Sequence, residues 1–163
     1  MSLVPSNIEK IERSQFLTFI DTTPSSTATY KILGIGVTDF AISYNPQVDT
    51  EKWIIEDNAR TSHNSNEKQG SVTQTAYKND ALFEFVNSCR DKLNCKTHIL
   101  DVDMWNGSGS SYPATLSDGK VVVTSYMGET GQIEYDLYYE GNATPGTVTI
   151  TDGVPTFTPS VSL

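Results

Sequence analysis

The segment Gln132–Tyr139 alternates between apolar and polar side chains, and this period of two constrains the fold more than any other feature. The side chains on one face of the segment are those of Ile133, Tyr135, Leu137 and Tyr139. The opposite face carries Gln132, Glu134, Asp136 and Tyr138. Successive side chains of a strand point to opposite faces, so the segment predicts a β-strand with one apolar side.

Further segments carry strand residue types, and turn residues separate them. These segments are Lys31–Val37, Phe40–Tyr44, Lys52–Glu56, Ser71–Tyr77, Lys96–Met104, Lys120–Met127, Thr147–Thr151 and Pro155–Phe157. Residues 128–131 and 152–153 are suited to hairpin turns.

One helix is predicted after Asn79 or Asp80, either of which can cap it. Its apolar stripe consists of Leu82, Phe85, Val86, Cys89 and Leu93. The predicted fold class is therefore mainly β, an antiparallel β-sandwich or barrel with one flanking α-helix.

The length of 163 residues fits one domain with a substantial core. Residues 1–29 are expected to form an N-terminal arm, because a polar, proline-containing break at Thr22–Thr27 follows a short apolar stretch. Residues 30–163 are expected to form a single domain.

The segment Asp57–Gly70 is long, polar and without hydrophobic periodicity. Compact domains rarely keep such a loop unless it has a function, so we expect it to make contacts in an assembly. The candidate contact residues are Asn58, Arg60, His63, Asn64, Glu67 and Lys68.

The chain has 20 acidic and 11 basic residues, which gives a net charge of −9. A groove that grips phosphates needs clustered Lys and Arg, and the sequence has no such cluster. The acidic side of the alternating strand, with Glu134 and Asp136, is either an ordinary solvent-exposed face or the lining of a lumen.

No pattern of residues predicts an enzyme, a metal site or a cofactor site. His63 falls in the polar loop, and His98 is expected on an edge or at the surface. Asp101 and Asp103 share one face of a strand, but two carboxylates without a third ligand are weak evidence for a metal. The two cysteines, Cys89 and Cys95, match no zinc pattern and are expected to be reduced.

The sequence contains no run of about 20 apolar residues that would predict a membrane span. The first five residues lack the basic and apolar regions of a signal peptide. We therefore expect a protein that is made in a cytoplasm and has no membrane partner.

The order of these segments resembles that of the tail tube proteins of long-tailed (siphovirus-type) bacteriophages. The resemblance runs from about residue 31 to residue 140. It rests on the segments Lys31–Val37, Asp39–Pro46, Glu51–Glu56 and Tyr77–Val86. It also rests on the long hairpin that the expected strands Lys52–Glu56 and Ser71–Tyr77 form with the polar segment Asp57–Gly70 between them. It covers most of the chain but contains no signature motif.

The resemblance implies a β-sandwich whose subunits form hexameric rings that stack into a tube. DNA passes through the lumen without specific binding, and the loop and the arm bridge subunits. The partners would be further copies of the chain, tape-measure proteins and tail-assembly proteins, and the location would be a virion tail. The residues Glu134 and Asp136 would line the lumen.

Two other classes of function are compatible with the sequence. One is a β-sandwich module that binds carbohydrate or a host surface, with Trp105 in an aromatic platform, although a partly buried Trp105 is the expectation here. The other is an enzyme that uses Asp101 and Asp103. A further tail component, such as a tail-completion or secretion-tube-like protein, would give a similar pattern.

Overall fold

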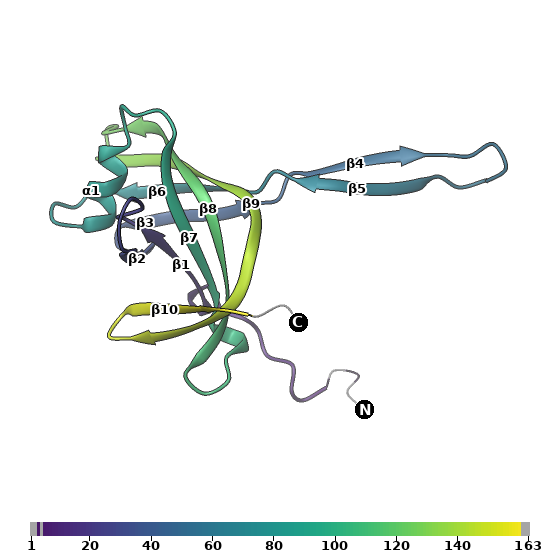
Figure 1. Ribbon diagram of the computed structural model, residues 1–163, viewed down its shortest axis with the longest axis horizontal. Coiled ribbons are helices and arrows are strands. Elements are labelled where there is room, and N and C mark those ends of the chain that lie inside the picture. The colour runs from purple at the N-terminus through teal and green to yellow at the C-terminus, as the bar shows by residue number, and fades with distance from the viewer. Residues whose placement is uncertain (1–2, 4, 161–163) are drawn as a thin grey trace.

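The computed structural model of the chain describes Leu3 and residues 5–160, and it is a curled antiparallel sheet from which a two-stranded hairpin projects (Figure 1). The strands are β1 (Phe16–Asp21), β2 (Tyr30–Ile32), β3 (Val37–Ser43), β4 (Pro46–Glu51), β5 (Arg60–Asn66), β6 (Gln69–Thr75), β7 (Cys95–Asp103), β8 (Ser111–Tyr126), β9 (Gln132–Thr151) and β10 (Val154–Pro159). The helical elements are α1 (Ala81–Ser88) and two short 3-10 turns, Arg13–Gln15 and Met104–Asn106. The predicted fold class is confirmed, because the curled sheet forms a half-barrel with one helix.

Seven strands of the main sheet follow one another in the order β2-β1-β7-β8-β9-β6-β3, and β10 pairs with β9. Every pairing is antiparallel. β4 and β5 pair only with each other and form a separate sheet. The long strands β8 and β9 bend along their pairing, with register shifts at Leu116/Asp118 and Val123/Ser125, as bulges do in curved sheets.

The sheet buries apolar side chains on both faces. One cluster lies under α1 and contains Ile20, Val72, Leu82, Phe83, Val86, Cys89, Ile99, Val121, Ile133, Tyr135 and Leu137. The other contains Phe19, Leu100, Val102, Ala114 and Val148. The predicted alternation of β9 is confirmed, since Ile133, Tyr135 and Leu137 are buried.

The helix begins where the sequence predicts, because the Asp80 side chain accepts a hydrogen bond from the Leu82 backbone N–H at 3.2 Å. Leu82, Val86 and Cys89 are buried against the sheet. The predicted stripe is wrong at its end. Leu93 is 94% exposed, because α1 stops at Ser88 and the chain turns toward β7.

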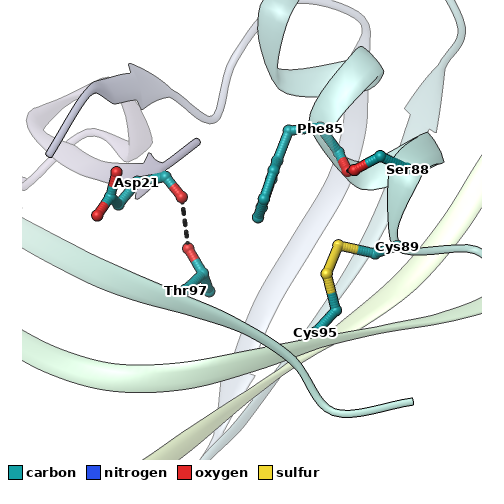
Figure 2. The surroundings of a disulfide bond; sticks show 6 residues. All are labelled: Asp21, Phe85, Ser88, Cys89, Cys95 and Thr97. Carbon is teal, nitrogen blue, oxygen red and sulfur yellow. Dashed lines mark hydrogen bonds between the residues drawn. A yellow bond between two sulfur atoms is a disulfide. The ribbon is translucent and has the colours of Figure 1, made fainter. Parts of the chain in front are cut away.

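The prediction of reduced thiols is also wrong, because Cys89 and Cys95 form a disulfide (Figure 2). Cys89 follows the last residue of α1, and Cys95 is the first residue of β7. The turn between them brings their Cα atoms to 5.6 Å, within the range that a disulfide spans. The bond fixes the end of the helix to the sheet beside Phe85.

Residues expected in the arm contribute a strand to the sheet. Phe16–Asp21 forms β1 between β2 and β7, and Phe19 and Ile20 are buried. The expected strand Lys31–Val37 is instead the end of β2, a turn and the start of β3. In that turn Gly36 has a φ of +72°, and an added Cβ would lie 2.5 Å from the Thr75 carbonyl oxygen.

Two predictions between residues 52 and 70 are wrong in a related way. Lys52–Glu56, expected as a strand, lies in the turn of the projecting hairpin. Asp57–Gly70, expected as a loop, contains β5 and the start of β6. The sequence does not mark β4 and β5 as paired strands, because they pair with each other without burying any side chain.

Candidate functional site

The projecting hairpin is the feature of the fold that no internal packing explains. All residues of β4 and β5 are exposed, and neither apolar cluster includes a residue of these strands. The strands are held by their own ladder, which pairs Pro46 with Asn66 and Glu51 with Arg60. Isolated two-stranded hairpins are marginally stable in water, so contact with another molecule would stabilise this one.

The tip of the hairpin is apolar, which is unusual for a segment that extends into solvent. We define the tip as residues 52–56. Within it, Trp53, Ile54 and Ile55 are 47%, 102% and 85% exposed. The Arg60 guanidinium lies 4.2 Å from the centroid of the Trp53 ring and forms an ion pair with Glu56. The tip is thus held in shape by charge and stacking while its isoleucines face solvent.

The sequence-predicted contact residues lie along this hairpin. Asn58 is exposed in the turn, and the Asn64 side chain donates a hydrogen bond of 2.6 Å to Asp49 on the facing strand. The His63 Nε2 atom lies 2.7 Å from the Asn66 Oδ1 atom. These contacts organise the hairpin internally, and their exposure leaves them accessible to a partner.

The hairpin joins the sheet at residues 44–45 and 67–68, where the ladder of hydrogen bonds changes from one sheet to the other. The Glu67 backbone N–H donates to the Asn45 carbonyl oxygen at 3.4 Å, and the Asn45 side chain donates to the Glu67 carbonyl oxygen at 3.1 Å. The Lys68 ammonium lies 3.4 Å from Asp101 and 4.1 Å from the centroid of the Tyr139 ring. Lys68 therefore ties the root of the hairpin to the sheet.

The Asp101 side chain is buried and has three polar partners. Its Oδ1 atom accepts hydrogen bonds from the Thr18 hydroxyl at 2.8 Å and the Tyr139 hydroxyl at 3.3 Å. Burial raises the pKa of Asp101 above its usual value, although Lys68 and these hydrogen bonds oppose the shift. Burial and the nearby Asp101 charge raise the pKa of Tyr139, so its hydroxyl remains a neutral donor.

A cavity of about 810 Å³ opens beside the root of the hairpin, and we call it the root cavity. Its walls come from the sheet and from β5 and contain Phe16, Ile42, Tyr44, His63, Asn64, Ser65, Asn66, Lys68, Asp101, Asp103, Thr115, Ser117, Tyr139, Gly141, Asn142 and Ala143. The prediction that Asp101 and Asp103 share a face is confirmed, since both line this cavity. Within the described residues, the half-buried Asp103 carboxylate has neither a hydrogen bond nor an ion pair.

The acidic pair Glu134 and Asp136 lies on the face of β9 opposite the buried side chains. Glu134 is exposed, and Asp136 accepts a hydrogen bond of 3.1 Å from the Ser71 hydroxyl. With Asp39 of β3 these carboxylates line a shallow hollow. The structure thus brings three acidic residues from β3 and β9 to one surface, although the sequence pointed only to the two on β9.

The remaining candidates for chemistry do not gather into one site. His98 lies on β7 and pairs with Asp118 of β8, whereas the ladder between β7 and β1 ends one residue away at Ile99, which agrees with the expected edge or surface position. The ring is partly exposed, with Nδ1 2.8 Å from the buried Asp21 carboxylate and Nε2 3.6 Å from Asp118. Among Leu3 and residues 5–160, no three His, Cys, Asp or Glu residues are arranged to hold a metal.

The sequence did not single out the apolar tip or the contact between Lys68 and Asp101. The available signal for the tip was Trp53-Ile54-Ile55 between charged residues, without the alternation of a strand. Lys68 and Asp101 are 33 positions apart, and no local pattern links them.

No protein-family model and no curated protein matches the sequence of this chain. None of the helices in the described part of the chain is long and apolar enough to cross a membrane.

Proposed function

We propose that the chain is a self-assembling structural subunit, of the kind that forms the tail tube of a long-tailed bacteriophage. The observation that carries the proposal is the projecting hairpin with its exposed apolar tip (Figure 1). A monomer gains nothing from extending Trp53, Ile54 and Ile55 into water, whereas an assembly gains the free energy of burying them.

The edges of the main sheet support the same proposal. β2 and β3 end the path of paired strands, so each has one side without a neighbouring strand in this sheet. Open edges favour pairing with another chain unless they are blocked. A repeated contact between different surfaces of identical subunits closes into a ring or continues as a filament.

Two further features agree with a tube through which DNA passes. The net charge of −9 and the surface that carries Asp39, Glu134 and Asp136 disfavour adhesion to phosphates. The Cys89–Cys95 disulfide suits a subunit that ends in a particle outside the cell, because disulfides persist on virion surfaces. In this proposal the subunits form stacked rings in a virion tail with tape-measure and tail-assembly partners, after synthesis in the host cytoplasm.

The experiment that tests the proposal is electron microscopy of the concentrated protein, with light scattering on the same sample. We expect rings or tubes from the unmodified chain and none from the variant with Trp53→Ser, Ile54→Ser and Ile55→Ser. The matched control is Leu93→Ser, which removes a 94% exposed apolar side chain far from the hairpin and should assemble normally. Assembly of the triple variant to the same extent as the unmodified chain would refute the role of the tip.

The second candidate function is a module that binds carbohydrate, and one observation favours it. Trp105, expected to be a partly buried anchor, is 47% exposed, so its ring can stack against a sugar. Saturable quenching of tryptophan fluorescence by a glycan, lost in Trp105→Ala, would support this function. A monomeric protein with that behaviour would replace the assembly proposal.

A further inference from the structure

The root cavity and the hairpin tip have complementary chemistry, although they lie at opposite ends of the hairpin. The root cavity carries two carboxylates, Asp101 and Asp103. Of its basic side chains, Lys68 is already paired with Asp101, and the His63 imidazole contacts Asn66. Asp103 therefore leaves a negative charge in the cavity without a partner from the described residues. A half-buried charge of this kind favours the approach of a cation.

The walls next to this charge are partly apolar. Phe16, Ile42 and Tyr44 line the same cavity, and Tyr44 is 54% exposed. An aromatic wall beside a carboxylate favours a segment that brings a cation together with apolar side chains. A volume of about 810 Å³ accommodates several side chains.

The hairpin tip is a segment of that composition. Lys52 is exposed and makes no ion pair within the described chain, and it directly precedes Trp53, Ile54 and Ile55. Of the other charges nearby, Arg60 pairs with Glu56, and Glu51 accepts a hydrogen bond from the Trp53 indole, while Asp57 is exposed just beyond the tip. Lys52 is thus the cation of this segment without an ion pair in the described chain. The tip thus offers one unpaired cation and three exposed apolar side chains.

The tip cannot enter the root cavity of its own chain. The hairpin extends straight away from the sheet in Figure 1, and the six residues of β4 carry the tip roughly 20 Å from the root. A second copy of the chain has the same cavity, and the tip can enter that cavity without any bending of the hairpin.

We propose that the hairpin tip of one subunit docks in the root cavity of a second subunit, with the Lys52 ammonium beside the Asp103 carboxylate. This inference rests on the proposed function and names the surface that receives the tip. The contact joins two different surfaces, so each subunit offers one tip and one cavity. Such a contact repeats from copy to copy and builds a ring or a filament.

A charge exchange between the two positions tests this contact on the full-length chain. Lys52→Asp and Asp103→Lys should each weaken self-association about tenfold at low ionic strength, because each places like charges together. The double variant should regain most of the association, since its two positions again carry opposite charges, with the negative charge on the tip and the positive charge in the cavity. Sedimentation velocity over a concentration series measures the effect.

The controls separate a lost contact from a lost fold. Lys78→Asp makes the same charge change at another exposed lysine and should leave association unchanged. Asp103→Asn removes the charge without adding a longer side chain, and it should also weaken association. Circular dichroism and thermal unfolding of each variant identify any that fails to fold.

The outcomes distinguish this inference from the function on which it rests. Rescue in the double variant supports the docking of the tip. The tip docks elsewhere if the unmodified chain assembles and the single variants assemble equally well. It also docks elsewhere if the single variants are weakened and the double variant shows no recovery. In both cases the proposed function stands. If the unmodified chain remains a monomer at every concentration and salt, both are overturned.

Discussion

The Asp101 carboxylate is buried where the hairpin joins the sheet, and its charge is balanced by a small set of neighbours. Lys68 faces it from the hairpin root, Thr18 from β1 and Tyr139 from β9. Asp103 and His63 line the same cavity. Desolvation outweighs the favourable contacts, and so the pKa of Asp101 is raised.

This raised pKa predicts how stability depends on pH. Between the ordinary pKa of an aspartate and the raised value, the folded chain binds more protons at this site than the unfolded chain. The contribution of Asp101 to the free energy of unfolding is therefore greatest below about pH 4, and it falls as the pH rises through the raised pKa. The Asp101→Asn variant cannot titrate here, so the stability advantage of the unmodified chain over it should shrink as pH increases.

Urea unfolding of both proteins measures this difference over a range of about pH 3.5 to 7, which starts near the ordinary pKa of an aspartate and extends above it. Asp57→Asn is the control, because Asp57 is exposed in the hairpin turn. An advantage that grows with pH would show that Lys68 stabilises the ionised carboxylate more than burial disfavours it.

Sequence patterns located some of these residues but not their relationship. The alternation of β7 places Asp101 and Asp103 on one face, and the structure confirms this. Burial of Asp101 follows from its position between β1 and β8 and from contact with Lys68, which lies 33 positions earlier. Side-chain contacts over such separations depend on strand order, which no local pattern contains.

At the scale of elements, the disulfide between α1 and β7 is the clearest addition to the predicted fold. It joins residues six positions apart, so it removes only a short loop from the unfolded ensemble. The chain-entropy relation for such a loop gives a stabilisation of about 2 kcal/mol. The bond also holds the end of α1 over the buried cluster that includes Leu82 and Val86.

Reduction of this disulfide should lower the melting temperature by roughly 4–8 °C for a domain of this size. Calorimetry with and without a thiol reductant measures the change. The Cys89→Ala/Cys95→Ala double variant is the control, and the reductant should not affect its unfolding. An unchanged melting temperature of the unmodified chain, with reduction verified by mass spectrometry, would contradict the prediction.

Elements whose buried side chains recur with a regular period were predictable, whereas β5, which buries no side chain, and β1, which is buried without alternation, were not. The strands β6 and β9 and the helix α1 were found because burial imposes a period on their side chains. β5 was expected as a loop, since all of its residues are polar and show no hydrophobic periodicity. Residues 52–56 were expected as a strand on their apolar content, yet they form the tip of the hairpin.

At the scale of the whole molecule, the main sheet and the hairpin are separable parts. The class of the fold followed from the sequence, but the strand order did not, because β1 inserts between β2 and β7. The core clusters draw their residues from the main sheet and α1. The hairpin adds a surface for contacts rather than a part of the core.

This separation predicts that the main sheet folds without the hairpin. Replacement of residues 46–66 by a short glycine-containing turn should leave the melting temperature within about 4 °C of that of the unmodified chain, because surface changes cost about 0.5 kcal/mol. The ends that would be joined are already close, since Asn45 and Glu67 hydrogen-bond to each other. Thermal unfolding measures the stability, and light scattering measures the expected loss of assembly.

A matched variant separates the hairpin's length from its tip. A chain that keeps β4 and β5 but carries serine at positions 53, 54 and 55 should be as stable as the shortened chain and equally unable to assemble. If the shortened chain unfolds at a much lower temperature, the hairpin supports the sheet, and its exposed tip then needs no partner to explain it. If both variants fold and remain monomers, the role of the hairpin's length is to bring the tip to another copy of the chain. Only a projecting tip can reach beyond its own subunit.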